Sequence, residues 1–170
     1  MSDAPSRKRI RLPEYDYSSP GAYFVTVCTH DRRCILSDIS IGEGLAPPGN
    51  HLTAIGRVVD AQIRELPRRY PCVRVENYVI MPNHIHLLVS IREDSGGASP
   101  SPTLFDVMRA LKSISTRLSR PNLGSAPLFQ RSYHEHVIRS ENDYLQIWEY
   151  IDTNPAKWAE DRYYQVNDEQ

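Results

Sequence analysis

The strongest constraint on the fold comes from residues 84–91, which read His-Ile-His-Leu-Leu-Val-Ser-Ile. Successive side chains of a β-strand point to opposite faces of the sheet, so residues two apart share a face. In such a strand the second, fourth, sixth and eighth side chains are all aliphatic and suit a core face. His84 and His86 would then leave the core together. The pattern predicts a strand with two neighbouring imidazoles on its non-core face.

The rest of the chain predicts strands and helices in the order β-α-β-β-α-β-α. The extended segments, rich in β-branched and aromatic residues, cover residues 22–29, 73–80, 84–91 and 128–139. The helices, with apolar residues three and four apart, cover residues 53–66, 103–119 and 140–154. Pro67 is expected to end the first helix, and Ser140 to cap the third. This order favours an α+β fold, a ferredoxin-like split βαβ arrangement with helices on one face of an antiparallel sheet.

The length of 170 residues suits one domain, with a flexible basic tail over 1–16 and an acidic tail over 160–170. No apolar run reaches the roughly 18 residues of a membrane span, and the polar N-terminus lacks a signal-peptide pattern. Three cysteines, with no C-x-x-C spacing, disfavour a disulfide framework or a zinc finger. We therefore expect a cytoplasmic protein with no membrane partner.

The charge is uneven along the chain. The net charge of -1 alone argues against a surface built throughout for nucleic acid. Residues 102–140, however, carry six basic and two acidic side chains, and residues 141–170 carry two and eight. The best candidates for contacts with DNA phosphates are Arg109, Lys112 and Arg120 on the second helix, and Arg7, Lys8, Arg9 and Arg11 in the basic tail. The alternative is a solvated helix face and a solvated tail.

Three groups of residues are candidates for chemistry. His84 and His86 could hold one metal ion, or they could line a polar strand face that a helix covers. His134 and His136 form a competing pair, although neighbouring arginines would discourage a cation. On the third helix, Gln146, Tyr150 and Asn154 are four residues apart and share a face. That face could present a hydroxyl nucleophile and a carbonyl ligand for a hard cation. Alternatively, Tyr150 is a half-buried tyrosine that bonds to water or backbone.

Several short motifs together resemble one known family. Residues 78–89 are similar to the His-hydrophobic-His motif of the single-tyrosine transposases of bacterial insertion sequences, including the Met-Pro-Asn turn before it. Further similarity to the REP-associated tyrosine transposases, relatives that act on repeated extragenic palindromes, lies in residues 23–26, 32–33, 129–139, 143–144, 149–151 and 154–157. These segments occur in the family's order and span about residues 20–160.

The resemblance implies a site and a reaction. His84 and His86 match the paired metal ligands, Asn154 the third ligand, and Tyr150 the catalytic tyrosine. The ion would be Mg²⁺ or Mn²⁺, and attack by the tyrosine would leave a 5′-phosphotyrosine and a free 3′ hydroxyl. His136 matches a position that is commonly histidine in this branch, with its role left open, and the general base is not identified.

The resemblance also implies partners. Family members recognise a hairpin of single-stranded DNA and an adjacent guide sequence, for which Tyr15, Tyr17 and Tyr133 are candidate stacking rings. We expect a nucleoid-associated enzyme that cleaves and rejoins DNA at palindromic repeats, as a monomer or a helix-exchanged homodimer. DNA should follow the basic helix and the metal site, clear of the tail after about residue 160. The alternatives are a hairpin-binding protein without catalysis and a metal-dependent hydrolase that does not use Tyr150.

Overall fold

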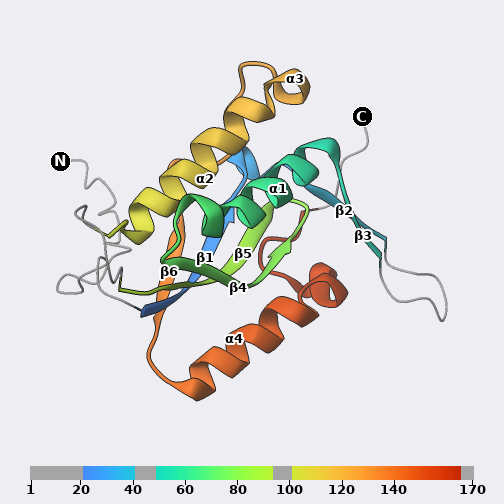
Figure 1. Cartoon of the computed structure of the whole chain (residues 1–170). Coiled ribbons are helices and arrows are strands. Elements are labelled where there is room, and N and C mark those ends of the chain that lie inside the picture. Colours follow the sequence, from blue (N-terminus) through green and yellow to red (C-terminus); the bar gives the residue numbers. More distant parts are fainter. Residues whose placement is uncertain (1–20, 41–48, 94–100, 166–170) are drawn as a thin grey trace, which may run out of the picture.

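The structure is a computed structural model that describes residues 21–40, 49–93 and 101–165 (Figure 1). Within these residues a four-stranded antiparallel sheet has the order β4-β5-β1-β6. Its strands are β1 (Gly21–Cys28), β4 (Val73–Ile80), β5 (His84–Ile91) and β6 (His134–Ile138). The tail cations Arg7, Lys8, Arg9 and Arg11, and the rings of Tyr15 and Tyr17, lie outside the described residues.

Two helices connect these strands. α1 (Ala54–Arg69) precedes β4, and α2 (Leu104–Leu118) joins β5 to the segment that leads into β6. The chain order β1-α1-β4-β5-α2-β6, combined with the observed strand order, is the ferredoxin-like split βαβ arrangement. The predicted α+β fold class is therefore confirmed.

The main core lies between α1, α2 and one face of the sheet. Tyr23, Val25 and Val27 of β1 are fully buried there, and so are the aliphatic side chains that alternate along β5. Thr103 caps α2 with a reciprocal capping box to Asp106, which satisfies backbone donors at the start of the helix. The period-two pattern of β5 thus directs its apolar side chains toward the two helices.

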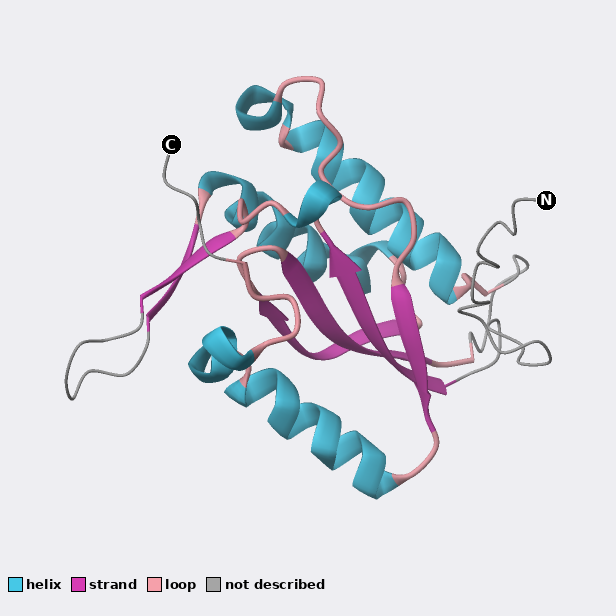
Figure 2. Ribbon diagram, turned by 180° about the vertical axis from the view of Figure 1, so that it is seen from behind, coloured by secondary structure: helices cyan, strands magenta, loops and turns pink. Residues whose placement is uncertain are grey.

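The opposite face of the sheet carries α4 (Glu141–Thr153). Figures 1 and 2 show α4 on the side away from α1 and α2, so the two helices of the split βαβ arrangement share one face and α4 lies on the other. The residues of the sheet on this side include Thr26, His84 and His86, whose polarity suits a site better than a core. Accordingly, Ile151 is the only residue of α4 that is buried.

Some elements differ from the expected boundaries. α1 continues past Pro67 to Arg69, since a proline in the last turn removes only one backbone donor, and the Tyr70 N–H still reaches the Leu66 carbonyl at 2.8 Å. A two-stranded sheet of β2 (Ser37–Ser40) and β3 (Gly49–Leu52) was not expected, because both strands are short and mostly polar.

The segment expected to be extended over 128–139 is a strand only in β6. Residue Phe129 forms an isolated bridge with Thr29. Ser140 caps α4 by accepting a hydrogen bond from the Asp143 N–H at 3.1 Å, as predicted. The shorter elements are α3 (Arg120–Leu123) and the 3₁₀ turns η1 (His30–Arg32) and η2 (Pro155–Glu160). Across the described part of the chain, no helix is both long and apolar enough to cross a membrane.

Candidate active site

The two histidines of β5 lie side by side, as their spacing predicted. Their Nε2 atoms are 3.0 Å apart, and both side chains are almost completely buried. His84 lies opposite Cys28 and His86 opposite Thr26 on the central strand β1, so the rigid middle of the sheet fixes both rings. Two imidazole nitrogens at this distance must either share a proton or bind a common cation, because two facing lone pairs repel.

Neighbouring side chains set the tautomers of both rings. Asn83 Oδ1 lies 2.9 Å from His84 Nδ1, and the Asn83 amide group donates to the Tyr163 carbonyl at 2.7 Å. This orientation leaves Oδ1 as the acceptor, so the proton of His84 sits on Nδ1 and its Nε2 lone pair is free. His86 Nδ1 is 2.8 Å from Thr26 Oγ1, which can accept from a protonated Nδ1 in the same way. Both rings can therefore offer Nε2 to a metal ion.

The pair stays uncharged at neutral pH. Burial lowers the pKa of His84 to about 3, and the nearby charges of Arg162 and Arg32 act in the same direction. Burial also holds the pKa of His86 well below its usual value, and His84 contributes to that shift. Because only the neutral ring binds metals, both histidines are in their ligand form.

Two oxygen donors complete the surroundings of the pair. Asp161 Oδ2 lies 3.9 Å from His84 Nε2, and its side chain is 3% exposed. The ligand atoms of His84, His86 and Asp161 all lie within 4.8 Å of one another. Asn154, at the end of α4, is 3% exposed, and its Oδ1 has no hydrogen-bond partner in the described structure. A buried carbonyl oxygen without a partner is costly unless a cation or water satisfies it.

Asp161 is a site residue that the sequence did not reveal. The segment after about residue 160, which was predicted to stay clear of the DNA, lies against the histidine pair at residues 161–163. Trp158 and Tyr163 are buried, and the Tyr163 ring lies 4.6 Å from the His84 ring. Burial of these two aromatic rings draws the acidic segment onto the histidines. Trp158 and Tyr163, two aromatic residues within an apparently acidic tail, were the sequence signal that this segment packs against the protein.

Tyr150 lies beside the histidine pair of its own chain. Its hydroxyl is 3.4 Å from His86 Nε2, while the residue remains 41% exposed. Phe24 makes an edge contact with the Tyr150 ring and stacks against His86, which holds the two rings in place. Burial, reinforced by the charge of Asp161, raises the pKa of Tyr150, although a hydrogen bond with Asn154 opposes this shift. The phenol is therefore protonated at neutral pH.

A cavity of about 250 Å³ opens next to these groups. It is lined by Tyr150, Asn154 and Asp161, together with Lys157, Glu160 and Arg162. Tyr150 is thus reachable from solvent. The arrangement can hold a divalent cation, position an anion near it and bring a hydroxyl nucleophile to the same place.

Comparison with known proteins finds one similar sequence and similar solved structures. No family model matches the chain. An uncharacterised protein of Haemophilus influenzae is 34% identical over 173 residues, which is 93% of each chain. The solved structure of a REP-associated tyrosine transposase bound to a REP hairpin matches with 25% identity and a TM-score of 0.58, over 81% of this chain and 67% of that one. The structure of this chain resembles that of a REP-associated tyrosine transposase.

A putative transposase from Deinococcus radiodurans also matches, with 20% identity and a TM-score of 0.48, over 84% of this chain and 95% of that one. The structural similarity to a REP-associated tyrosine transposase supports a DNA-processing activity of the transposase type. In this chain the family resemblance places His84, His86, Tyr150 and Asn154 at the site, and the four residues do lie together.

The other residues predicted from the sequence lie elsewhere. His136 is exposed on β6 and pairs with Asp143 at the start of α4, with 2.8 Å between His136 Nε2 and Asp143 Oδ2. His134 is also exposed. Neither joins a group of three possible metal ligands in the described part of the chain. Arg109, Lys112 and Arg120 border a groove along α2, on the opposite side of the sheet from α4.

Proposed function

We propose that this protein is a metal-dependent, single-strand DNA transesterase that cleaves and rejoins DNA at palindromic repeats through Tyr150. The observation that carries the proposal is the position of the Tyr150 hydroxyl, 3.4 Å from the Nε2 atom of His86 in the same chain. Tyr150 is 41% exposed, so burial of its ring does not by itself require contact with the histidine pair. It is well placed as a nucleophile beside a cation-binding group.

The residues present fit a divalent cation. His84 and His86 offer two nitrogens, Asp161 a carboxylate oxygen and Asn154 a buried carbonyl oxygen that has no other partner. Mixed nitrogen and oxygen donors suit Mn²⁺ at least as well as Mg²⁺, because imidazole is softer than the ligands that Mg²⁺ prefers. When bound, the ion supplies Lewis-acid stabilisation of the charge that develops on the phosphate. Asp161 is the ligand that we add to the set implied by the family.

The protein's own side chains carry out the remaining steps of cleavage. Tyr150 Oη forms a bond to the phosphorus, and the bond from phosphorus to the 3′ oxygen breaks. The phenolic proton passes to solvent in the neighbouring cavity, and the departing 3′ oxygen takes up a proton. Lys157 and Arg162, which line that cavity, hold the negative phosphate in place. The product is a 5′-phosphotyrosine and a free 3′ hydroxyl.

Rejoining reverses these bond changes. A 3′ hydroxyl attacks the phosphorus of the phosphotyrosine, the Tyr150 oxygen leaves, and a phosphodiester forms again. The number of phosphate ester bonds is the same before and after, so the reaction needs no nucleotide cofactor. Phe24 contributes by keeping the Tyr150 ring against His86 through both steps.

The proposed substrate is hairpin DNA of palindromic repeats. The related transposase structure carries a REP hairpin, which supports this choice. Arg109, Lys112 and Arg120 are proposed phosphate contacts, as are the tail residues Arg7, Lys8, Arg9 and Arg11. Since Tyr150 faces the histidines of its own chain, a monomer can complete the site without exchanging α4. Such an enzyme would act at the nucleoid in the cytoplasm.

A covalent adduct tests the proposal. The protein is incubated with end-labelled hairpin DNA and Mn²⁺, and the products are separated under denaturing conditions. We expect a labelled protein band that disappears with EDTA and in Tyr150→Phe. Tyr164→Phe is the matched control, since Tyr164 is similarly exposed at 39% but lies outside the hydroxyl–histidine contact. Cleavage that persists in Tyr150→Phe would favour a hydrolase, and binding without cleavage by the wild type would favour a binding protein.

A further inference from the structure

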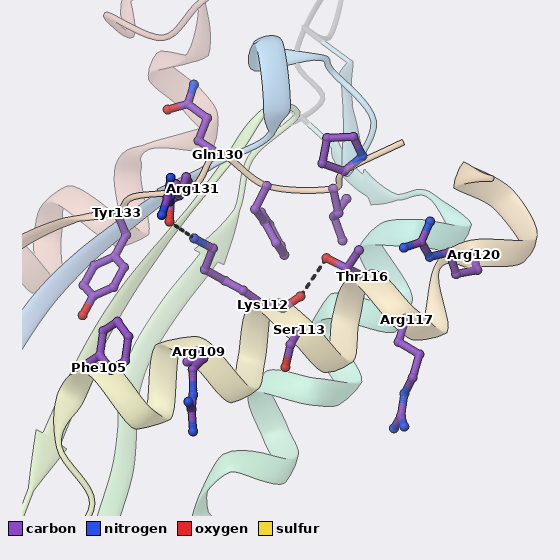
Figure 3. Close-up of a pocket in the computed structure, with 13 residues that line it drawn as sticks. Phe105, Arg109, Lys112, Ser113, Thr116, Arg117, Arg120, Gln130, Arg131 and Tyr133 are labelled. Atoms are coloured by element: carbon purple, nitrogen blue, oxygen red, sulfur yellow. Dashed lines mark hydrogen bonds between the residues drawn. The ribbon is translucent and has the colours of Figure 1, made fainter. Parts of the chain in front are cut away.

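A second cavity lies on the other side of the sheet from Tyr150. It has a volume of about 690 Å³ and runs between α2 and residues 127–133, the segment that leads into β6 (Figure 3). This volume falls within the roughly 300–1,000 Å³ of small-ligand sites. None of the residues assigned to the metal and tyrosine chemistry borders it, so it calls for a separate explanation.

The charge of this groove has one sign. Five cationic side chains border it, namely Arg109, Lys112, Arg117, Arg120 and Arg131. None of the described residues that line it carries a carboxylate. Such a concentration of positive charge in a concave surface attracts anions. The groove therefore suits a ligand with several negative charges, spaced along its length.

Lys112 shows that the positive charge is partly held out of water. Its Nζ donates to the Arg131 carbonyl at 2.7 Å, across the groove from α2 (Figure 3). Burial lowers the pKa of Lys112, which means that its surroundings do not already compensate its charge. An ammonium has three donors, so a bound phosphate oxygen can be added to the existing bond.

The groove also offers aromatic surface. Phe105 and Tyr133 lie at one end of it, from opposite walls, and Phe129 lines it from the segment before β6 (Figure 3). Phe105 is 47% exposed, which is unusual for a ring of that size. The guanidinium of Arg109 lies 6.0 Å from the centre of the Phe105 ring. A flat, partly apolar group that enters this end would therefore meet a ring face and a cation together.

We propose that this groove binds unpaired nucleotides of the DNA strand, with a base stacked against Phe105 and the adjoining phosphates on the arginines. Aromatic rings beside cations are the combination that single-stranded nucleic acid needs, because every unpaired base has a free face to stack. A paired base within a duplex has no such face available. The inference rests on the proposed function, for which it names a second contact on the same substrate.

Binding measurements without cleavage test the groove. Fluorescence anisotropy in EDTA compares a hairpin that carries an unpaired extension with the same hairpin without one. For the extended hairpin we expect Phe105→Ala and Phe105→Leu to weaken binding roughly 5- to 100-fold, as for other stacked bases. The blunt hairpin should bind these variants like the wild type. Arg109→Ala should also reduce the salt dependence by about 0.7 in log–log slope, the value for one phosphate contact on a single strand.

Arg68→Ala is the matched control, because it removes an equally basic side chain from α1, where Arg68 is 80% exposed. Unchanged binding of the extended hairpin by the Phe105 variants would overturn the proposal. Equal losses for both hairpins would also overturn it, since the groove would then contact the duplex. The adduct assay distinguishes a failure of the groove proposal from a failure of the proposed cleavage chemistry. A wild type that binds the extended hairpin through the groove but forms no adduct refutes only the chemistry.

Discussion

The hydrogen bond between Thr26 and His86 provides a test of how the metal site is built. Thr26 Oγ1 lies 2.8 Å from His86 Nδ1, and both residues are at most 2% exposed. Metal binding through Nε2 requires the proton of His86 to reside on Nδ1, where Thr26 is the acceptor. Thr26→Val keeps the shape of the side chain but removes that acceptor, so the metal-bound ring would keep a buried N–H without a partner.

Thr26→Val should lower both the stability of the fold and the affinity for metal. An unsatisfied buried donor costs about 1–3 kcal/mol, which should appear as a loss in the free energy of unfolding measured by urea titration in EDTA. Loss of a group that orients a metal ligand usually costs about 10- to 100-fold in metal affinity. Isothermal titration calorimetry with Mn²⁺ should show a decrease of that size for Thr26→Val. Adduct formation at limiting Mn²⁺ should fall in parallel and recover at high Mn²⁺.

Thr116→Val serves as the control, because the Thr116 hydroxyl donates only to the Lys112 carbonyl within α2, away from the histidines. Its Mn²⁺ affinity should equal that of the wild type. A Thr26→Val protein that is destabilised but binds Mn²⁺ within twofold of the wild type would refute the reasoning. The histidine orientation would then not depend on the hydrogen bond from β1.

Three further predictions concern pH, the acidic ligand and the source of the tyrosine. Because the pKa of His84 is about 3 in the folded protein and near 6.5 in the unfolded chain, metal-free protein should lose about 1.4 kcal/mol of stability per pH unit as the pH falls below 6.5. The loss from His84 alone should reach about 2 kcal/mol at pH 5. Asp161→Asn should weaken Mn²⁺ binding roughly tenfold or more in calorimetry, whereas Asp31→Asn, at an exposed carboxylate, should not. A mixture of Tyr150→Phe with His84→Ala protein should form no adduct, because each chain uses its own tyrosine and histidines.

Each of these predictions has a clear contrary result. A urea midpoint that is constant between about pH 7 and pH 5 would mean that His84 binds protons equally in both states. Unchanged Mn²⁺ affinity in Asp161→Asn would remove that residue from the ligand set. Adduct formed by the mixed variants would show that α4 is exchanged between subunits.

Local pattern was enough to predict the histidine strand. Alternation along residues 84–91 determines which side chains share a face, and this depends only on strand geometry. The pairing of His86 with Thr26 was not predictable, because it depends on the register between β1 and β5, strands that are far apart in the sequence. The shared face of Tyr150 and Asn154 was likewise visible in helical spacing, but the side of the sheet on which α4 packs was not.

Asp161 and the groove along α2 show the other limit of sequence reasoning. The acidic composition after residue 160 suggested a solvated tail, whereas two aromatic side chains carry this segment back to the site. Arg109, Lys112 and Arg120 were predicted to lie on one helix and do border one groove, but Arg120 belongs to α3 and not to α2. Their separation from Tyr150, however, follows from the sheet that lies between α2 and α4 (Figure 1). Tertiary packing, which no local sequence pattern encodes, determines both the position of Asp161 and the separation of the groove from Tyr150.

The most direct test of the central claim is to locate the DNA on the protein. After reaction with Mn²⁺ and hairpin DNA of known sequence, the adduct is digested with protease and nuclease and analysed by tandem mass spectrometry. We predict a single modified peptide from α4, with a 5′-linked nucleotide on Tyr150 and a free 3′ hydroxyl on the released fragment. A nucleotide on any other side chain, or cleaved DNA with both fragments free of protein, would contradict the account.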